Sequence, residues 1–273
     1  MEERQIQTER GTVHYWISQK LNTDVTLVFL HGLTADHTLF EKQVGYFSEK
    51  CSMIAWDAPA HGKSRPYDGF TYPNAAEVLK TILDENRVDS AVLIGQSMGG
   101  YVIQSFLQRY PHRAKAFIGI DTCPYGDYYS ASDKWWLRQI EWMCRLYPIH
   151  MLKKAMAKQC AKTEYAYRNM LAAISPYDKT ELCHLLGIGF AGFLEDNREM
   201  TISCPVLLLV GESDRTGKVR KYCDEWTKRT GYPLHIIKNA AHNSNADHPD
   251  EVNALMEAFL RGHAMWPETA EMI

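Results

Sequence analysis

The sequence predicts an α/β fold, a mostly parallel, doubly wound sheet flanked by helices, and three observations support this prediction. Short, nearly continuous apolar runs recur along the chain, as expected for strands buried on both faces of a parallel sheet. Segments with helical spacing separate most of these runs, and such alternation implies right-handed crossovers. One long interval, residues 124–203, contains helical segments but no buried strand, which indicates a helical insertion after the strand that ends near Asp121.

The strands are expected at eight places. RQIQTE and TVHYWIS alternate in polarity on either side of Arg10-Gly11, as in an opening hairpin. The remaining strands are apolar runs that end abruptly in polar or glycine-containing segments. In chain order they are DVTLVFLHG, SMIAWDAPAHGKS, SAVLIGQS, KAFIGIDT, CPVLLLVGESD and PLHIIKNAAH.

Five helices are expected between the strands, and further helices in the insertion. The insertion contains DKWWLRQIEWMCRLYP, IHMLKKAMAKQCA and EYAYRNMLAAI, and it is too apolar to be a disordered linker. We therefore predict a core of residues 1–123 and 204–273 and a helical cap, or lid, over 124–203. The helices of the core are expected at residues 39–48, 73–86, 99–110, 215–230 and 249–262.

Composition and charge exclude several classes of protein. The 273 residues carry a formal net charge of -3 and no long run of Lys or Arg, which argues against nucleic acid or an anionic membrane as a partner. The polar start, MEERQIQTER, and the absence of a long apolar stretch lead us to expect a cytoplasmic protein. Its seven scattered cysteines include no CxxC pair, so we expect reduced thiols rather than disulfides or a zinc site.

Ser97 is the candidate nucleophile. It lies in LIGQSMGGY, where an apolar strand ends and a helix begins, and chemistry collects at the carboxyl ends of parallel strands. Gly95 and Gly99 allow the close backbone approach that a sharp turn requires, and the helix N-terminus favours a developing negative charge. The alternative is a glycine-rich turn with an inert serine.

A serine hydroxyl needs a base and a group that orients the base. His242 follows the last predicted strand and Asp214 follows the strand before it, in the order Ser, Asp, His. Asp214 is alternatively an N-cap of the next helix. Asp121, at the end of KAFIGIDT, is a rival for the orienting acid, and we favour Asp214 from its motif position.

These motifs resemble those of the α/β-hydrolase fold superfamily, as a serine hydrolase with a helical cap, over nearly the whole chain. The resemblance depends on GQSMGG, VGESD, NAAHNSNADHP and FLHGL, the last of which is similar to the family's oxyanion loop. It implies that the backbone N–H groups of Leu33 and Met98 form the oxyanion hole. WDAPAHGKS is similar to another loop of the family, although Ala58-Pro59-Ala60 departs from its glycine-bearing form. Neither His31 nor His61 follows a strand end where a base is required, so we expect His31 to organise the oxyanion loop and His61 to brace WDAPAHG, rather than either to act as the base.

The expected function is hydrolysis of a carboxylic ester, or a related carbonyl substrate, through an acyl-enzyme on Ser97, without metal or organic cofactor. The resemblance also implies that a serine at this position disfavours epoxide opening and halide displacement, for which relatives use aspartate. Two alternatives stay open. One is carbon–carbon bond hydrolysis, lyase chemistry or acyl transfer with the same three residues, and the other is a non-catalytic or slow ligand receptor.

The substrate is expected to be a small to medium, apolar molecule bound under the insertion. Aromatic and methionine side chains at helical spacing more often pack in the interior, so interior packing is the alternative role for each expected pocket residue. Self-association into a homodimer stays open, and the tail 263–273 either packs on the core or mediates contact through Trp266. The expected pocket residues are Phe40, Tyr125, Trp136, Met143 and Phe190.

Overall fold

A computed structural model describes residues 1–20 and 23–266 and contains one eight-stranded sheet. The strand order is β1-β2-β4-β3-β5-β6-β7-β8. Strand β2 is antiparallel to both of its neighbours, and every other pair of neighbouring strands is parallel. The predicted fold class is therefore confirmed. The strands are β1 (Glu2–Thr8), β2 (Gly11–Ser18), β3 (Thr26–Leu30), β4 (Ser52–Trp56), β5 (Ala91–Gln96), β6 (Ala114–Ile120), β7 (Val206–Gly211) and β8 (Leu234–Ile237).

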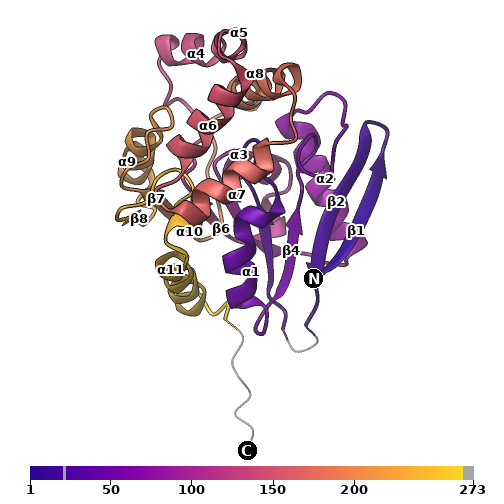
Figure 1. The fold of residues 1–273 in the computed structure, drawn as a ribbon. Coiled ribbons are helices and arrows are strands. Elements are labelled where there is room, and N and C mark those ends of the chain that lie inside the picture. The colour runs from indigo at the N-terminus through magenta and orange to yellow at the C-terminus, as the bar shows by residue number, and fades with distance from the viewer. Residues whose placement is uncertain (21–22, 267–273) are drawn as a thin grey trace, which may run out of the picture.

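Helices cover both faces of this sheet (Figure 1). One face carries α2, α3 and α9, and the other carries α1 and α11. The four-residue α10 follows β8, and short 3-10 helices precede α1 and β6. The bounds are η1 (His37–Phe40), α1 (Glu41–Phe47), α2 (Tyr72–Glu85), α3 (Met98–Arg109), η2 (Pro111–Arg113), α9 (Val219–Thr230), α10 (Ser244–Asp247) and α11 (Pro249–Gly262).

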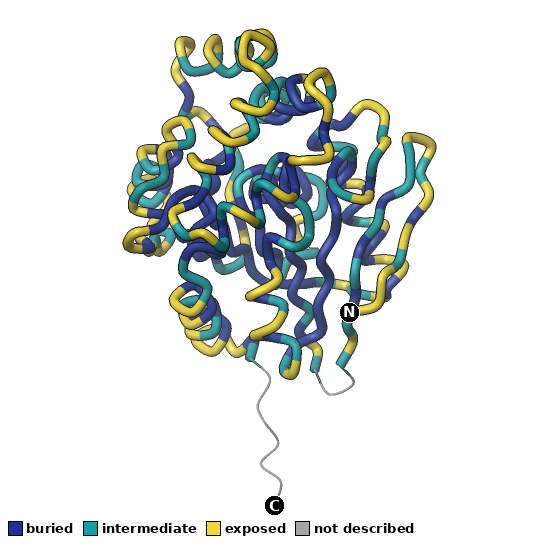
Figure 2. Tube along the Cα trace, viewed as in Figure 1, coloured by how far each residue is buried: buried dark blue, intermediate teal, exposed yellow. Residues whose placement is uncertain are grey.

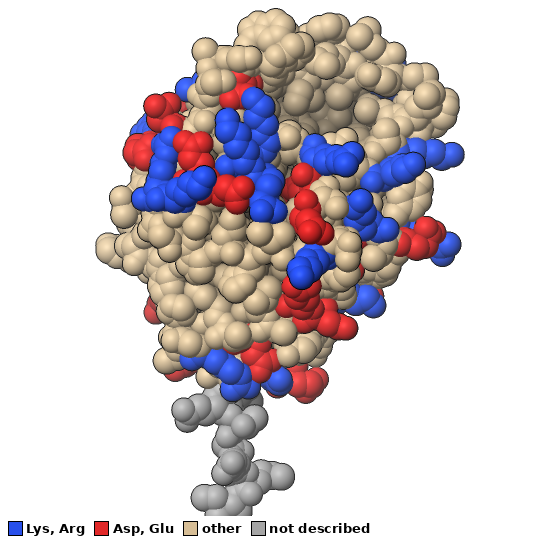
Figure 3. Space-filling view, turned by 90° about the vertical axis from the view of Figure 1, so that its left-hand side faces the viewer, with Lys and Arg blue, Asp and Glu red and all other residues tan. Residues whose placement is uncertain are grey.

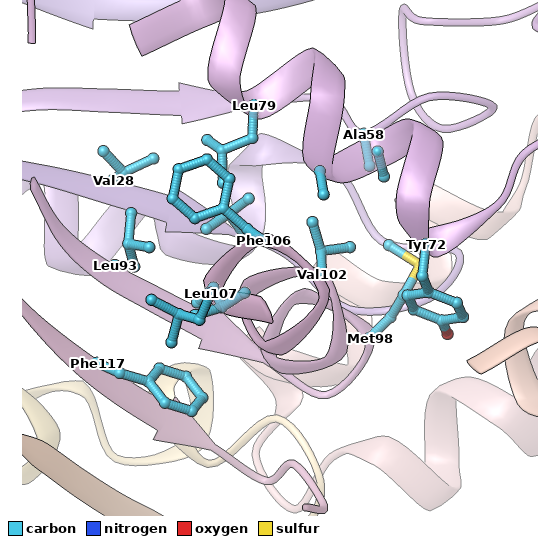
Figure 4. Packing of buried hydrophobic residues seen from close by; sticks show 14 of the residues in the cluster. Val28, Ala58, Tyr72, Leu79, Leu93, Met98, Val102, Phe106, Leu107 and Phe117 are labelled. Carbon is cyan, nitrogen blue, oxygen red and sulfur yellow. The ribbon is translucent and has the colours of Figure 1, made fainter. Parts of the chain in front are cut away.

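The central strands are buried on both faces because helices cover them. Every residue of β4, β5 and β7 is buried, which explains their continuous apolar runs (Figure 2). In Figure 4, Leu79 of α2 and Phe106 of α3 pack beside Val28 and Leu93 of the sheet. This packing fixes the strand ends from which the candidate residues project.

The inserted helices α4 to α8 all lie between β6 and β7, beyond the carboxyl edge of the sheet (Figure 1). The division of the chain into a core and a cap domain stays a prediction. The helix over 179–196 was not predicted, because that segment is apolar on several sides and contains three glycines. The inserted helices are α4 (Ala131–Leu137), α5 (Ile140–Arg145), α6 (Ile149–Cys160), α7 (Glu164–Ile174) and α8 (Lys179–Asp196).

One expected helix begins later than predicted, and one residue of the expected tail is placed. Helix α9 begins at Val219 rather than near residue 215, because the Asp214 carboxylate accepts the Thr216 N–H and Gly217 takes a φ of 55° in the intervening turn. Trp266 packs edge-on against Phe47 of α1, with ring centroids 5.9 Å apart, whereas residues 267–273 of the predicted tail lie outside the described residues.

The seven cysteines form no disulfide in the described chain. Within residues 1–20 and 23–266, every helix is too short or too polar to cross a bilayer.

Candidate active site

Ser97 occupies a strained turn between β5 and α3. Its φ of 49° and ψ of -113° are rarely adopted by a residue with a side chain, so the surrounding structure must hold it there. The Ser97 N–H donates to the Ile120 carbonyl at 2.9 Å, and Thr122 Oγ1 donates to the Ser97 carbonyl at 2.8 Å. A side chain at position 99 would meet the Leu30 carbonyl oxygen at 1.9 Å, so the turn packs against β3 only with glycine there.

Ser97, His242 and Asp214 form one hydrogen-bonded chain. His242 Nε2 lies 2.8 Å from Ser97 Oγ, and His242 Nδ1 lies 2.8 Å from Asp214 Oδ2. The side chains of His242 and Asp214 are 7% and 0% exposed. Because Asp214 only accepts, Nδ1 carries the proton and Nε2 is left as the acceptor for the Ser97 hydroxyl.

The electrostatics of His242 result from opposing effects. Burial lowers the pKa of His242, but the charge and hydrogen bond of Asp214, with a further contribution from Asp121, raise it above the ordinary histidine value. The imidazolium form is therefore stabilised in place. A base with this property accepts a proton readily from Ser97.

Asp121 also follows a parallel strand but forms no hydrogen bond with His242. Its carboxylate accepts the backbone N–H of Gly211 at 2.7 Å and of Ser244 at 3.0 Å. Burial and the nearby charge of Asp214 raise the pKa of Asp121 to about 8. Asp121 thus ties together the two loops that carry Asp214 and His242, so the structure places the rival acid behind the chain of three residues.

The candidate oxyanion donors are two backbone groups near Ser97. The N–H of Leu33 and the N–H of Met98 donate no hydrogen bond to any group in the described part of the chain. Leu33 lines a cavity with Ser97, and Met98 is the first residue of α3, where helix N–H groups lack internal acceptors. Both groups are consequently available to a ligand oxygen.

His31 braces the loop that carries Leu33. It is fully buried, its Nε2 accepts the Ala58 N–H at 2.9 Å, and its Nδ1 donates to the Gly32 carbonyl at 2.8 Å. Burial lowers the pKa of His31, so the ring stays neutral. These contacts connect the FLHGL and WDAPAHGKS segments.

His61 lies beside His31, with ring centroids 5.2 Å apart. Its Nδ1 lies 2.9 Å from the Pro59 carbonyl, and burial lowers its pKa to about 3. In the same segment Asp57 accepts from the backbone and ring nitrogens of His37, at 2.8 and 2.7 Å. Asp36, His37 and Asp57 are close enough to share a cation, but their hydrogen bonds account for both carboxylates.

Two cavities meet at Ser97 and His242. The larger has a volume of about 490 Å³ and lies between α4, α5, α8 and α9, whereas the smaller, of about 180 Å³, lies under Leu33 and against α6 to α8. Ile140, Phe190 and Thr216 border both. Apolar and aromatic side chains dominate the two linings, and the larger volume falls in the range of roughly 300–1,000 Å³ common for small-molecule sites.

The expected pocket residues divide into two groups. Trp136, Met143 and Phe190 line the larger cavity. Phe40 and Tyr125 line neither cavity. Both rings instead have packing partners in the interior. Phe40 is fully buried against Phe29, with ring centroids 5.1 Å apart, and Tyr125 stacks on Phe193.

Three residues around the site were not predicted from the sequence. Gln96 donates to the His242 carbonyl at 2.7 Å, although it fills the unconstrained position of Gly-x-Ser-x-Gly. Asp247 accepts the N–H groups of Lys162, Thr163 and Ala241 at 2.8 to 3.0 Å, and so fastens the insertion to the His242 loop.

Thr216 is the third residue. Its hydroxyl is buried, borders both cavities and has no hydrogen-bond partner among the described residues. A ligand atom in either cavity is therefore offered a free hydroxyl. In the sequence Thr216 is an ordinary turn residue, and no spacing distinguishes it.

Comparison with known proteins finds relatives with an α/β-hydrolase fold. The sequence model of the alpha/beta hydrolase fold matches residues 25–147, which include Leu33 and Ser97. A 3-oxoadipate enol-lactonase from Acinetobacter baylyi is 24% identical over 86% of this chain and 88% of its own length. The chain spans only 29% to 37% of the length of the first curated relatives that it matches.

Solved structures are similar over nearly the whole chain. An esterase from Thermogutta terrifontis, bound to malate, has a TM-score of 0.78 and 21% identity, with 96% of this chain and 99% of that chain covered. An N-acyl homoserine lactone degrading enzyme has a TM-score of 0.78 and 19% identity, with 94% and 100% covered. At this level of identity the likeness shows the fold.

Proposed function

This chain belongs to the α/β-hydrolase fold superfamily, and we propose that it is a serine hydrolase that cleaves carboxylic esters through an acyl-enzyme on Ser97. One observation carries the proposal. Ser97, His242 and Asp214 are joined by two hydrogen bonds of 2.8 Å at the meeting point of two apolar cavities.

In the proposed reaction, Ser97 Oγ attacks the ester carbonyl carbon while His242 Nε2 takes its proton. The carbonyl oxygen becomes an oxyanion, which the N–H groups of Leu33 and Met98 stabilise. The tetrahedral intermediate collapses, the C–O bond to the alcohol breaks, and His242 returns the proton to the alcohol oxygen. Asp214 stabilises the imidazolium throughout and holds its tautomer.

Deacylation repeats these steps with water. His242 takes a proton from a water molecule that attacks the acyl carbon, and a second oxyanion forms at the same two N–H groups. When this intermediate collapses, the bond to Ser97 Oγ breaks and His242 protonates the serine. The products are one alcohol and one acid, and Ser97 is regenerated.

The two cavities support an ester with an apolar group on each side of the carbonyl. Because both cavities begin at Ser97, the acyl and alcohol parts of one substrate can occupy different cavities. Thr216 borders both and offers a hydroxyl to the substrate. We therefore propose a small to medium, largely apolar substrate.

A second candidate is a lactone. The full-length enol-lactonase relative and the lactone-degrading structural neighbour favour it, and a lactone is an internal ester that the same groups open. Ring opening keeps the alcohol attached to the acyl-enzyme, so a single cavity accommodates the whole substrate. Turnover of lactones in preference to open-chain esters of similar size would support this candidate.

The test is a series of nitrophenyl esters with graded acyl chains, assayed with wild type and Ser97→Ala. We expect release of nitrophenol from wild type, no release above background from Ser97→Ala, and covalent labelling of Ser97 alone by a fluorophosphonate. Labelling without ester turnover would point to carbon–carbon bond cleavage, lyase or transfer chemistry. A folded protein whose Ser97 cannot be labelled would contradict the proposal and favour a ligand receptor.

A further inference from the structure

The inserted helices expose an unusual number of large apolar side chains. Six of the nine large hydrophobic residues that are exposed in the described chain fall within residues 135–151. This stretch includes part of α4, the whole of α5 and the start of α6, at the end of the molecule far from α11 (Figure 1). The six are Trp135, Trp136, Trp142, Leu146, Tyr147 and Met151, each 52% to 70% exposed. We call them the apolar tip.

Internal packing does not account for the apolar tip. Neither α4 nor α5 contains a buried residue. Trp135 and Trp136 contact each other edge-on, with centroids 4.7 Å apart, and Trp142 Nε1 donates to the Gln139 side chain. Clusters of exposed apolar side chains on this scale mark binding surfaces.

The charges beside the apolar tip are mainly positive. Residues 131–160 contain six Lys or Arg and two Asp or Glu, although the chain as a whole has a net charge of -3. Both acidic residues are paired, Asp133 with Lys218 at 2.5 Å and Glu141 with Arg145 at 2.8 Å. On the face shown in Figure 3, the upper end is free of charged side chains, and blue Lys and Arg side chains lie below it among red Asp and Glu side chains.

We propose that the apolar tip docks on an anionic lipid surface. Tryptophan and tyrosine side chains favour the boundary between water and lipid, and nearby cations are attracted to anionic headgroups. A second copy of this chain fits less well, because a symmetric contact would bring two positively charged segments together. The expectation of no membrane partner relied on the net charge of the whole chain, and that value does not reveal the local excess of Lys and Arg in residues 131–160.

Docking in this orientation would place the candidate active site next to the lipid. Trp136 and Met143, from the same two helices, line the larger cavity that ends at Ser97. An apolar ester dissolved in lipid could then enter without crossing bulk water. This consequence rests on the proposed function, whereas the docking itself does not depend on catalysis.

The test is co-sedimentation of the full chain with vesicles of phosphatidylcholine alone or mixed with phosphatidylglycerol. We expect stronger binding to the mixed vesicles at low salt, and equal binding by Ser97→Ala. The double variant Trp135→Ser/Trp142→Ser changes neither cavity lining. Its binding to the vesicles should be weaker than that of wild type by a factor of at least about ten. The matched control is Ile236→Ser, an exposed residue on β8, which should bind like wild type.

Charge is tested separately with Lys154→Glu/Lys158→Glu, two exposed positions of α6. Each cation near an anionic surface contributes about 1 kcal/mol, or about a fivefold change in binding, so the loss of two cations should weaken binding about 25-fold and their reversal to Glu at least as much. Lys228→Glu, in the last turn of α9, is the control.

Three results would overturn the proposal. One is no binding of wild type to the mixed vesicles at low salt. Another is undiminished binding by the tryptophan double variant. The third is a dimer in sedimentation velocity that this variant abolishes, without any vesicle binding, which would assign the apolar tip to a contact between two copies.

Discussion

Asp121 and Asp214 follow neighbouring parallel strands, yet their carboxylates face different partners. Asp214 Oδ2 lies 2.8 Å from His242 Nδ1, whereas both oxygens of Asp121 accept backbone N–H groups, from Gly211 and Ser244. Asp214 is thus placed to orient the base, and Asp121 to hold the loops that present the base and its acid.

Replacement of each aspartate by asparagine separates these roles. Asp214→Asn should lower kcat by about four orders of magnitude, because an amide that donates to Nδ1 imposes the wrong tautomer on His242. Asp121→Asn should retain most of the activity but lower the free energy of unfolding by about 1–3 kcal/mol, because its amide nitrogen cannot accept the N–H that it faces. Steady-state kinetics and urea unfolding measure both, and the reverse ranking of kcat would reassign the orienting acid.

The pH dependence of activity follows from the raised pKa of His242. Only the neutral imidazole accepts the Ser97 proton, so kcat/KM should fall as the pH drops through a value above 6.5, the ordinary value for histidine. Asp121 adds to the pKa of His242 only when ionised, and its own pKa of about 8 leaves it mostly protonated where this limb falls, so Asp121→Asn should leave the limb nearly unchanged. A limb that moved to lower pH on this substitution would show that Asp121 is charged beside the base.

Stability should also depend on pH through Asp121. Its pKa is raised from 3.8 to about 8 in the folded protein, so the folded state binds more protons than the unfolded state between these values. Asp121 therefore contributes stability at low pH that is lost as the pH rises towards about 8. Denaturant unfolding across this range should show a decline that is smaller in Asp121→Asn. Equal slopes for the two proteins would contradict the raised pKa.

The strain at Ser97 predicts a trade between stability and activity. Its φ of 49° is tolerated better by glycine than by a residue with a Cβ. Ser97→Gly should therefore be more stable to unfolding than the matched Ser97→Ala by about 1 kcal/mol, while neither hydrolyses ester. Urea midpoints measure this difference. If Ser97→Ala were the more stable variant, the turn would not be strained.

Each cavity should determine a different half of the substrate. Met156 lines only the smaller cavity and Met143 only the larger, so replacing each by alanine enlarges one cavity and spares the other. In a matrix of esters that vary separately in acyl and alcohol length, each variant should extend the preferred length of a different part. If both variants relaxed the same part, the substrate would bind in one cavity.

Local patterns predicted most of the strands and core helices, because their periodicity directly reflects burial. Helix α8 was missed because it is apolar on several sides and its three glycines are unfavourable in a helix, and only the packing in the fold explains them. A side chain at Gly187 would come within 2.6 Å of Glu141, and one at Gly189 within 2.4 Å of Leu33. Phe40 and Tyr125 were misplaced for a related reason, since an aromatic residue that lines a cavity and one that fills the interior have the same local pattern.

The sequence by itself determined the α/β class, the strained turn at Ser97 and the order of Ser97, Asp214 and His242, because strand ends and glycine-rich turns are local features. Only the tertiary structure decided which aspartate meets His242, that Asp247 fastens the insertion to the His242 loop, and that Thr216 keeps a free buried hydroxyl. Those outcomes depend on how loops from distant parts of the chain meet across the sheet edge, and their geometry is not encoded in the spacing of residues along any one segment.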